Sequence, residues 1–361
     1  MKPLFSYKKD LSPLLKLAVP MALTGIVQSS TYFFETIFLA HVSQDVLAAS
    51  ALVSWLFATI IVVLFGTLGS VNILVSHKHG ANDQKGISFV FRDGVLLAIL
   101  LVIPTIIICW NMSPIFLFFK QPASVVVLAQ SYLHALAWGI LPDFIIVALM
   151  ELMIGLGHAR LVMIFSFLSV GLTIGWSCVL IFGKFGFPAF GIAGAGYGTA
   201  ISYWISLFAL IIYLFSKKSY RIYLQNIFTF TKPFYLWELI KIGLPMGLMF
   251  CIEVGFFFAI TLIMGSFSGE LLAANQIAMQ YLGLMMSIIF SIAQAITVRM
   301  GHLMGAREFV SAEKAAYLGV SLSGIFMSVI AVLYWFFPYM LISVDFNVHE
   351  AANFEITHFA A

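Results

Sequence analysis

The segment LLKLAVPMALTGIVQ at residues 14–28 recurs as LIKIGLPMGLMFCIE at residues 239–253, at an offset of 225 residues. The same offset continues without a gap, and a register held from residue 14 to residue 81 is hard to obtain from shared hydrophobicity alone. Such internal similarity predicts two copies of one structural unit. The aligned pairs include Lys16 with Lys241, Pro20 with Pro245, Met21 with Met246, Leu47 with Leu272, His77 with His302 and Gly80 with Gly305.

The composition excludes a water-soluble protein. Hydrophobic residues make up 62% of the 361 residues and charged residues only 9%, and the mean hydropathy is +1.06; about a quarter of a soluble domain is charged. The net charge of +3 is small and spread along the chain, which excludes a nucleic-acid surface. The three cysteines lie within apolar stretches, which favours core packing over disulfides or a metal cluster.

Nine stretches are long and apolar enough to cross a bilayer, which takes about 20 residues of helix. The first stretch is too long for a signal-peptide core and has no small-residue cleavage site, so we expect it to remain as a membrane anchor. The stretches lie near residues 13–39, 46–73, 94–119, 126–156, 161–183, 189–215, 239–265, 272–298 and 315–343.

The basic residues predict the orientation of these spans. Lys and Arg concentrate in the N-terminal segment and in every second loop, and only Lys120 and Lys184 fall on the other side. Because short cytoplasmic loops retain basic residues, we expect the N-terminus in the cytoplasm. The favoured location is the bacterial inner membrane.

Six spans separate each position from its copy, so both copies enter the membrane in the same direction. This arrangement is a parallel repeat about an axis along the membrane normal, with a central cleft where the copies meet. The predicted fold is an all-α polytopic membrane protein of two helix bundles. Residues 1–225 form a six-helix bundle, and residues 226–361 form spans seven to nine and the start of span ten. Since Ala361 maps onto Leu136 (361 − 225 = 136), we expect a truncated second bundle, with a natural nine-span protein as the alternative.

Four carboxylates lie inside the predicted spans, where an ionisable group costs roughly 2.5–3.5 kcal/mol. Each one is therefore a functional candidate. Glu151 lies near the end of span four, where snorkelling or capping explains it. Asp143 follows Pro142, which frees a backbone group, and a structural role and a functional role are equally supported.

Glu35 is better supported because it ends a polar stripe on one face of span one. A polar stripe in a membrane helix faces protein or water, and the alternative to function is hydrogen bonding between helices alone. The stripe consists of Thr24, Gln28, Thr31 and Glu35.

Glu253 lies in the middle of span seven, among Met and Phe residues with no nearby charge. A carboxyl group in such surroundings either takes up and releases a proton or supplies a hard oxygen to a cation. Both are transport chemistry. A second polar face on span eight is expected to line the same cleft and consists of Gln276, Gln280, Ser287, Ser291 and Gln294.

Three further patterns give no catalytic prediction. The chain has no GxxxxGK[ST] sequence, so nothing indicates ATP hydrolysis. The glycines between residues 191 and 198 open an apolar span without a preceding strand, which favours close helix packing over a dinucleotide loop. His77 and His79 share a basic stretch, which favours a solvated loop over a metal site.

Five segments carry a likeness to known proteins: Pro20, Gln28 and Glu35 followed by TIFLAH, IGLGHARLVM at 154–163, GIAGAGYGTAIS at 191–202, IKIGLPMGLMFCIEV at 240–254, and LAANQIAM at 272–279. They resemble the multidrug and toxin extrusion (MATE) transporter family, and the last two resemble its NorM branch. The resemblance implies two six-helix bundles around a V-shaped cleft, and export of cationic drugs against inward flow of Na+ or H+. It also implies that Glu253 is the cation-coupling glutamate of the second bundle and that Glu35 is the first-helix acid.

The sequence departs from the family pattern at three points. The first-helix acid is usually Asp, whereas this chain has Glu35. Two asparagines common on the fifth helix align with Thr173 and Ser177, which weakens the implied ion site of the first bundle. The acidic partner of Glu253 would lie on the tenth helix, beyond Ala361, so we expect an incomplete coupling site.

The predicted function is secondary antiport of cationic amphipathic drugs or toxins in exchange for Na+ or H+, and not an enzyme activity. No cofactor is expected besides the coupling ion, and no metal besides Na+ at Glu253. The expected partners are small-molecule cations and the bilayer; no oligomer is implied. One alternative is a lipid-linked sugar flippase, which would need Lys or Arg in its cleft. The others are an intramembrane enzyme using His134 near Asp143, and a nonfunctional remnant of a broken gene.

Overall fold

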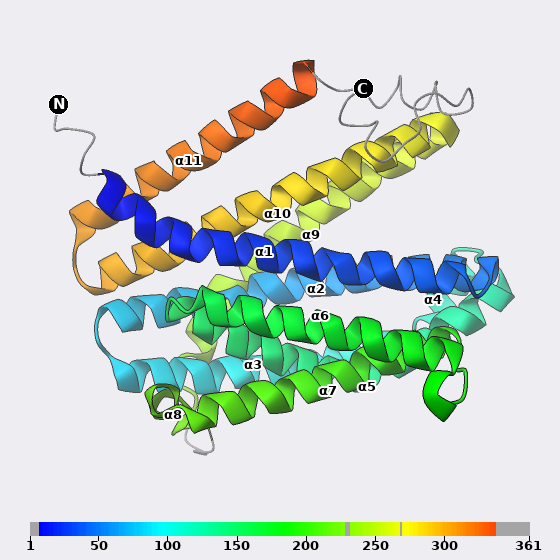
Figure 1. Ribbon diagram of the computed structural model, residues 1–361, viewed down its shortest axis with the longest axis horizontal. Helices are drawn as coiled ribbons and strands as arrows, with labels where there is room; N and C mark the ends of the chain where they lie inside the picture. The colour runs from blue at the N-terminus through cyan, green and yellow to red at the C-terminus, as the bar shows by residue number, and fades with distance from the viewer. Residues whose placement is uncertain (1–6, 228–231, 268, 337–361) are drawn as a thin grey trace.

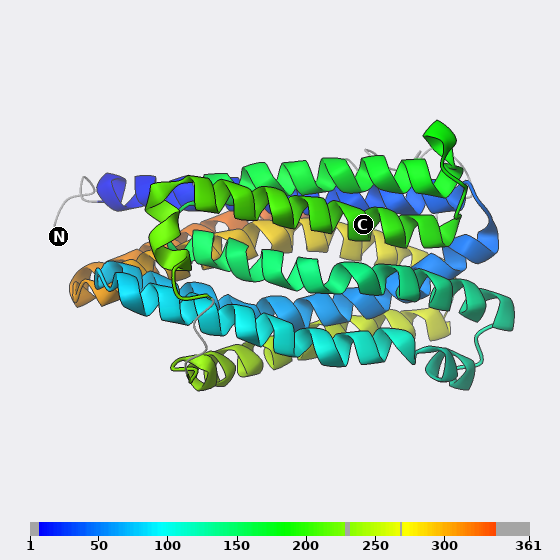
Figure 2. The ribbon, with the colours of Figure 1, turned by 90° about the horizontal axis from the view of Figure 1, so that it is seen from below.

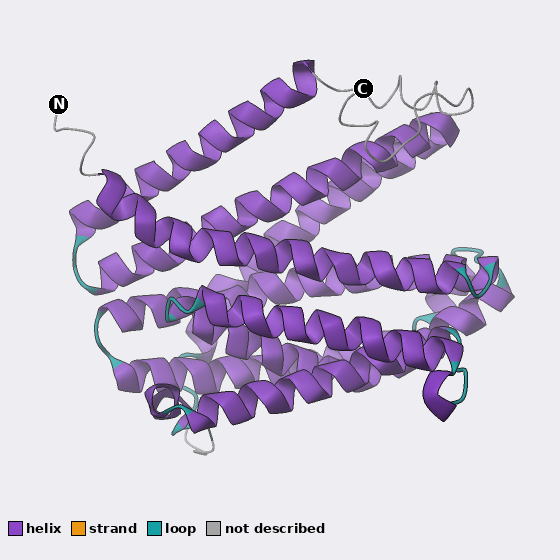
Figure 3. Cartoon of the chain, viewed as in Figure 1, coloured by secondary structure: helices purple, strands orange, loops and turns teal. Residues whose placement is uncertain are grey.

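The structure is a computed structural model that describes residues 7–227, 232–267 and 269–336, in which helices are joined by short loops and turns (Figures 1 and 3). Within them, nine helices are long and apolar enough to span a membrane. These helices are α1 (Tyr7–Ala40), α2 (Gln44–Gly80), α3 (Gln84–Trp110), α5 (Ala123–Gly155), α6 (Ala159–Phe182), α7 (Ile192–Ser216), α9 (Leu236–Phe267), α10 (Gly269–Gly305) and α11 (Phe309–Phe336). The described residues contain no strand. The predicted all-α membrane fold with nine spans is therefore confirmed.

The helix boundaries differ most from prediction around the second and third spans. α2 continues to Gly80 and α3 begins at Gln84, where the Asp83 side chain accepts a hydrogen bond from the Gly86 amide (2.8 Å). Lys78 and Arg92 therefore lie in helices, although the apolar pattern predicts a loop there. At its other end α3 stops at Trp110, and α4 (Ser113–Phe118) is a separate short helix. Residues 337–343 of the predicted span 315–343 lie outside the described residues.

The predicted repeat is visible in the turns that follow α2 and α10. The Ala81 amide donates to the His77 carbonyl (3.1 Å), and the Ala306 amide donates to the His302 carbonyl (3.0 Å). The next residue in each turn has a positive φ, 56° at one site and 63° at its copy. Those residues, Asn82 and Arg307, are again 225 positions apart, so both copies of the repeat build the same turn.

The same ends of α2 and α10 also contact each other reciprocally. A Cβ on Gly80 would clash with the His302 carbonyl, and a Cβ on Gly305 would clash with the His77 carbonyl. Gly80 and Gly305 correspond in the repeat, and so do His77 and His302, so each contact is the copy of the other. A two-fold relation between the two copies requires such reciprocal contacts. The His79 ring lies 4.9 Å from the His302 ring across this contact, in place of the predicted solvated loop.

α5 forms the centre of the helical assembly. It packs against α2, α3 and α7, while α1 packs against α6. α9 packs against α2, and α10 packs against both α2 and α1. Figure 2 shows these long helices lying lengthwise beside one another. α5 buries side chains along most of its length, from Val125 to Ile154, because its sequence is apolar on all sides.

The helices after residue 236 are buried mainly near one end, the end at which α1 begins. On α9, Leu239 is fully buried, whereas Ile252 is 73% exposed and Phe256 is 62% exposed. Figure 1 shows α9, α10 and α11 diverging from α1 and α2 toward the opposite end. The backbones of α2 and α9 approach closely at Gly66, where a Cβ would lie 2.5 Å from the Gly247 Cα. Glycine allows this close crossing.

Candidate functional site

A carboxylate shared by three helices defines the candidate site. The Thr199 hydroxyl on α7 donates to Oε1 of Glu35 on α1 (2.9 Å), and the Tyr132 hydroxyl on α5 lies 3.4 Å from Oε2. Tyr132 is 4% exposed and Thr199 is 7% exposed. A carboxylate with hydroxyl donors on both oxygens is well suited to hold a negative charge or to exchange it for a proton or cation.

The glycine-rich start of α7 explains how Thr199 reaches Glu35. A Cβ on Gly198 would lie 2.5 Å from the Ser177 amide nitrogen on α6, and a Cβ on Gly196 would lie 2.6 Å from the Ala135 Cβ on α5. The predicted close packing of this segment is therefore confirmed. Because α7 lies tightly between α5 and α6, Thr199, the residue after Gly198, faces the carboxylate of α1.

Asp143 extends the same polar region along α5. It is partly buried and lies within electrostatic range of Tyr203 on α7 and Tyr32 on α1. Tyr203 interacts in the same way with Glu35. The structure thus brings two of the predicted carboxylates, Glu35 and Asp143, into one region of the first six spans, where Tyr32 and Tyr203 interact electrostatically with both.

The tyrosines and Thr199 are site residues that sequence reasoning missed. Tyr132 and Tyr203 lie in apolar stretches where a tyrosine is ordinary. Thr199 and Tyr203 are four residues apart on α7 and therefore share a helix face. That spacing was the signal from which a polar face on α7 could have been predicted.

The rest of the predicted stripe on α1 does not join this site. The Thr24 hydroxyl donates to the Pro20 carbonyl of its own helix (2.9 Å). Gln28 and Thr31 are partly buried, and no hydrogen bond links them to the other described helices. Of the four stripe residues, only Glu35 is bonded across helices within the described part of the chain.

Glu253 is separate from the site around Glu35. It is partly buried on α9, and no hydrogen bond or ion pair joins it to the residues described. Ser287 on α10 is also partly buried and faces α1, where a Cβ on Gly25 would lie 3.6 Å from the Ser287 Cβ. The side chains of Gln276 and Gln280 lie outside those that the structure describes.

A second buried carboxylate joins the two copies of the repeat. Glu151 on α5 is only 2% exposed, and it accepts a hydrogen bond from Asn72 on α2 (2.6 Å). The Gln294 amide on α10 lies 3.4 Å from both Glu151 oxygens. The prediction that Glu151 snorkels or caps is therefore wrong, because two amide side chains compensate its burial inside the protein.

A buried ion pair fixes the connection into α9. The Arg92 guanidinium lies 2.8 Å from the Asp93 carboxylate, and Asp93 is fully buried. Asp93 also accepts from the Tyr235 amide (2.6 Å), and Arg92 donates to the Lys232 carbonyl (3.2 Å). The basic-loop pattern counts Arg92 as a surface cation, whereas the structure uses it to hold the segment before α9 against α3.

The structure does not show a contact between His134 and Asp143, the pair on which an intramembrane enzyme would depend. His134 lies 2.6 Å from the Gln130 side chain, and its ring lies 4.9 Å from the Trp110 ring, so its recorded partners do not include Asp143. No group of three metal-ligating side chains occurs among the described residues.

Within the described residues, nine apolar helices of membrane-spanning length, three of which share the carboxylate of Glu35, define a polytopic α-helical membrane protein. The MatE family model matches residues 20–179 and 245–352, which is more than half of the chain. The protein belongs to the MatE family, whose members are transporters and not enzymes. The predicted resemblance is therefore confirmed.

Curated relatives agree with this assignment. The chain is 30% identical over 277 residues to a probable multidrug resistance protein NorM of Synechocystis sp., covering 76% of this chain and 60% of the relative. It is 34% identical over 272 residues to a probable multidrug resistance protein NorM of Oceanobacillus iheyensis, covering 74% of this chain and 60% of the relative. It is 28% identical over 280 residues to the multidrug resistance protein NorM of Vibrio cholerae, covering 77% of this chain and 61% of the relative. The chain thus spans about 60% of the length of these relatives.

Solved structures share the fold. An outward-facing multidrug resistance MATE family transporter of the MOP superfamily matches with a TM-score of 0.83 at 21% identity, over 96% of this chain and 77% of that chain. A eukaryotic MATE transporter matches with a TM-score of 0.83 at 18% identity, over 98% of this chain and 78% of that chain. These matches establish the arrangement of the helices.

Proposed function

We propose that this protein is a secondary antiporter that exports cationic amphipathic molecules in exchange for Na+ or H+. The observation that carries the proposal is Glu35, a membrane-embedded carboxylate held by hydroxyls from α5 and α7. The names of the NorM relatives, multidrug resistance proteins, support the substrate class. A lipid-linked sugar flippase is not favoured, because the relatives named above are multidrug resistance proteins.

The chemistry of the site suits either coupling ion. Carboxylate and hydroxyl oxygens from Glu35 and Thr199 are hard ligands of the kind that a desolvated cation accepts. Protonation of Glu35 would instead turn one of its oxygens from an acceptor into a donor, so the bonds from Thr199 and Tyr132 would rearrange. Either event changes the contacts between α1, α5 and α7, and transport requires that each ligand favour a different arrangement.

Glu253 is proposed as a second coupling acid, in the part of the chain after residue 226. We further propose that residues 1–225 and 226–361 act as two halves, with the N-terminus in the cytoplasm of a bacterial cell and the spans in its inner membrane. The alternation of basic residues between loops supports this orientation.

Energetics limit the exchange. An entering monovalent cation gains about 2.3 kcal/mol per 100 mV, and a tenfold concentration gradient adds about 1.4 kcal/mol. Together these support roughly a 500-fold gradient of a neutral substrate exchanged one for one. For a singly charged cation the electrical contributions cancel and about tenfold remains, so strong export of cations requires more than one coupling ion.

Reconstitution of this chain in liposomes tests the proposal. Efflux of a fluorescent cationic dye is measured while Na+ and pH gradients are imposed separately, and at least one gradient is expected to drive it. Glu35→Gln should abolish the driven efflux, whereas Glu313→Gln, an exposed acid at the start of α11, should not. Efflux that ignores both gradients, or that survives in Glu35→Gln, would contradict the antiport mechanism.

A further inference from the structure

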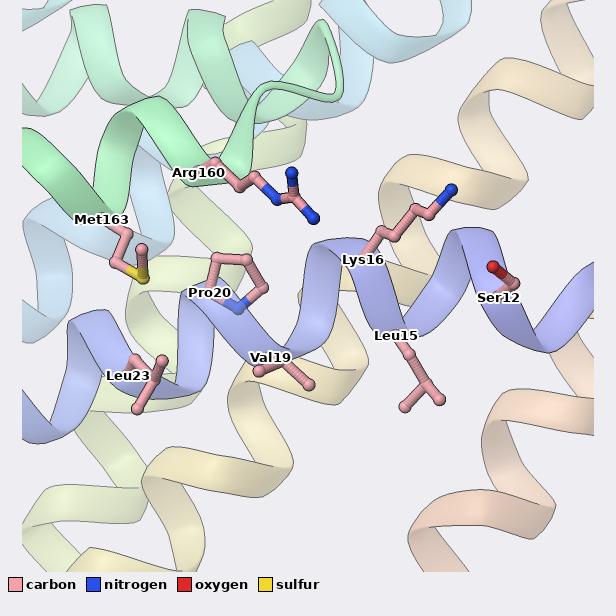
Figure 4. A pocket seen from close by; sticks show the side chains of 8 residues that line it. All are labelled: Ser12, Leu15, Lys16, Val19, Pro20, Leu23, Arg160 and Met163. Carbon is pink, nitrogen blue, oxygen red and sulfur yellow. The ribbon is translucent and has the colours of Figure 1, made fainter.

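A cavity of about 520 Å³ lies between the beginnings of α1 and α6 (Figure 4). Two cations line it: Lys16 on α1 and Arg160 on α6. A second cavity of about 370 Å³ shares both side chains and adds His158 and Tyr220. The two cavities therefore form one groove with Lys16 and Arg160 at its middle, which we call the α1–α6 groove.

The charge of the α1–α6 groove is not compensated by the side chains that the structure describes. Among the described side chains, no acid lines either cavity, and neither Lys16 nor Arg160 forms an ion pair with the described residues. Both side chains are exposed, and Figure 4 shows them on the same side of α1. Two adjacent free cations, one of them a guanidinium, are suited to bind a phosphate group.

The walls of the groove are apolar and continue into the span. Leu15, Val19 and Leu23 follow one another along α1 and are 39%, 52% and 41% exposed. On the facing helix, Ile164 is 60% exposed. Lys16 lies four residues after Ser12, where the first span begins, and Arg160 lies one residue after Ala159, where α6 begins. The cations thus lie at headgroup depth, with apolar surface toward the bilayer interior.

We propose that the α1–α6 groove binds one anionic phospholipid, with its phosphate between Lys16 and Arg160 and its acyl chains along α1 and α6. A zwitterionic lipid carries a cation of its own, which these side chains would repel. A free phosphate ion would satisfy the charges but would leave the exposed leucine and valine surface uncovered. Basic pockets between transmembrane helices on the cytoplasmic side recognise anionic headgroups by the same chemistry.

Native mass spectrometry of the detergent-solubilised protein, titrated with phosphatidylglycerol or phosphatidylcholine, tests this assignment. The wild type is expected to retain one phosphatidylglycerol and to prefer it at least tenfold over phosphatidylcholine. Each basic side chain contributes about fivefold to anionic-lipid affinity, so Lys16→Gln combined with Arg160→Gln should weaken binding about 25-fold. Unchanged phosphatidylglycerol binding in this double variant would overturn the proposal.

Two matched variants separate the site from general basic charge. Lys218→Gln with Arg221→Gln removes one exposed Lys and one exposed Arg outside the groove and should leave binding unchanged. Lys16→Arg with Arg160→Lys keeps both charges and should retain binding. An equal loss in the Lys218 and Arg221 variant, or displacement of the lipid by millimolar inorganic phosphate alone, would also overturn the assignment.

Discussion

A single methyl group at residue 66 tests the crossing of α2 and α9. A Cβ built on Gly66 would lie 2.5 Å from the Gly247 Cα and 2.6 Å from the Gly247 nitrogen, whereas ordinary contacts begin at 3.4 Å. Gly66→Ala therefore forces the helices apart by 0.9 Å (3.4 − 2.5). Both opposing atoms are backbone, so no side-chain rotation relieves the clash.

The expected cost follows from two opposing effects. Overpacking of a tight contact costs about 1–3 kcal/mol, and replacing a helical Gly with Ala returns up to about 1 kcal/mol. Because both opposing atoms are backbone, the cost should fall in the upper half of this range, about 2–3 kcal/mol. Subtracting the gain of about 1 kcal/mol leaves an expected net loss of about 1–2 kcal/mol in the free energy of unfolding. Thermal unfolding in detergent, followed by tryptophan fluorescence, measures the loss.

Two glycines supply matched controls for this substitution. A Cβ on Gly69, one helical turn further along α2, would meet only the flexible end of Met246 at 3.7 Å, and a Cβ on Gly255 of α9 would meet nothing within 4 Å. Gly69→Ala and Gly255→Ala should keep or raise stability. If Gly66→Ala matched them, the close crossing of α2 and α9 would be refuted.

Two further predictions concern charged groups. Asp93→Asn leaves the buried Arg92 without its counter-ion and should lower the free energy of unfolding by about 3–5 kcal/mol. Asp83→Asn, at an exposed pair with Lys78 (3.6 Å), should lower it by under about 1 kcal/mol. Equal melting temperatures for the two variants would contradict the role of Asp93. Burial, and secondarily His79, lower the pKa of His158, so the folded protein binds a proton there less readily than the unfolded chain does. The contribution of neutral His158 to stability is full above its unfolded pKa of about 6.5 and is lost as pH falls below that value. His158→Asn should therefore flatten the dependence of melting temperature on pH between about 7 and 5. An unaltered slope in this variant would exclude His158 as the source of the dependence.

The fold could be predicted from sequence because its signals are repeated. Apolar stretches of membrane-spanning length gave all nine helices, and the 225-residue offset anticipated the matching turns at Asn82 and Arg307. The boundary between α2 and α3 could not be predicted this way, because Lys78 and Arg92 look like loop residues until their partners are known. Hydropathy registers a charge and carries no information about what neutralises it.

The candidate site was predictable only in part, for a similar reason. A carboxylate in a span is conspicuous in any sequence, so Glu35 and Asp143 could be found. The donors to Glu35 could not, because Tyr132 and Thr199 come from helices 97 and 164 residues away in the chain. The prediction for Glu151 was wrong because its position near the end of its span suggested access to water. Its actual partners, Asn72 and Gln294, lie on two other helices.

The location of the Gly66–Gly247 crossing, about a third of the way along α9, turns this helix into a lever with two unequal arms. Twenty residues, about 30 Å of helix, extend from Gly247 to Phe267, where α9 ends. A tilt of about 10° at the fulcrum would carry that far tip roughly 5 Å sideways. The other arm, the 11 residues from Leu236 to Gly247 (247 − 236), is about 16 Å long and would move only about 3 Å. A slight adjustment among a few glycines therefore produces its largest displacement at the far tip of α9.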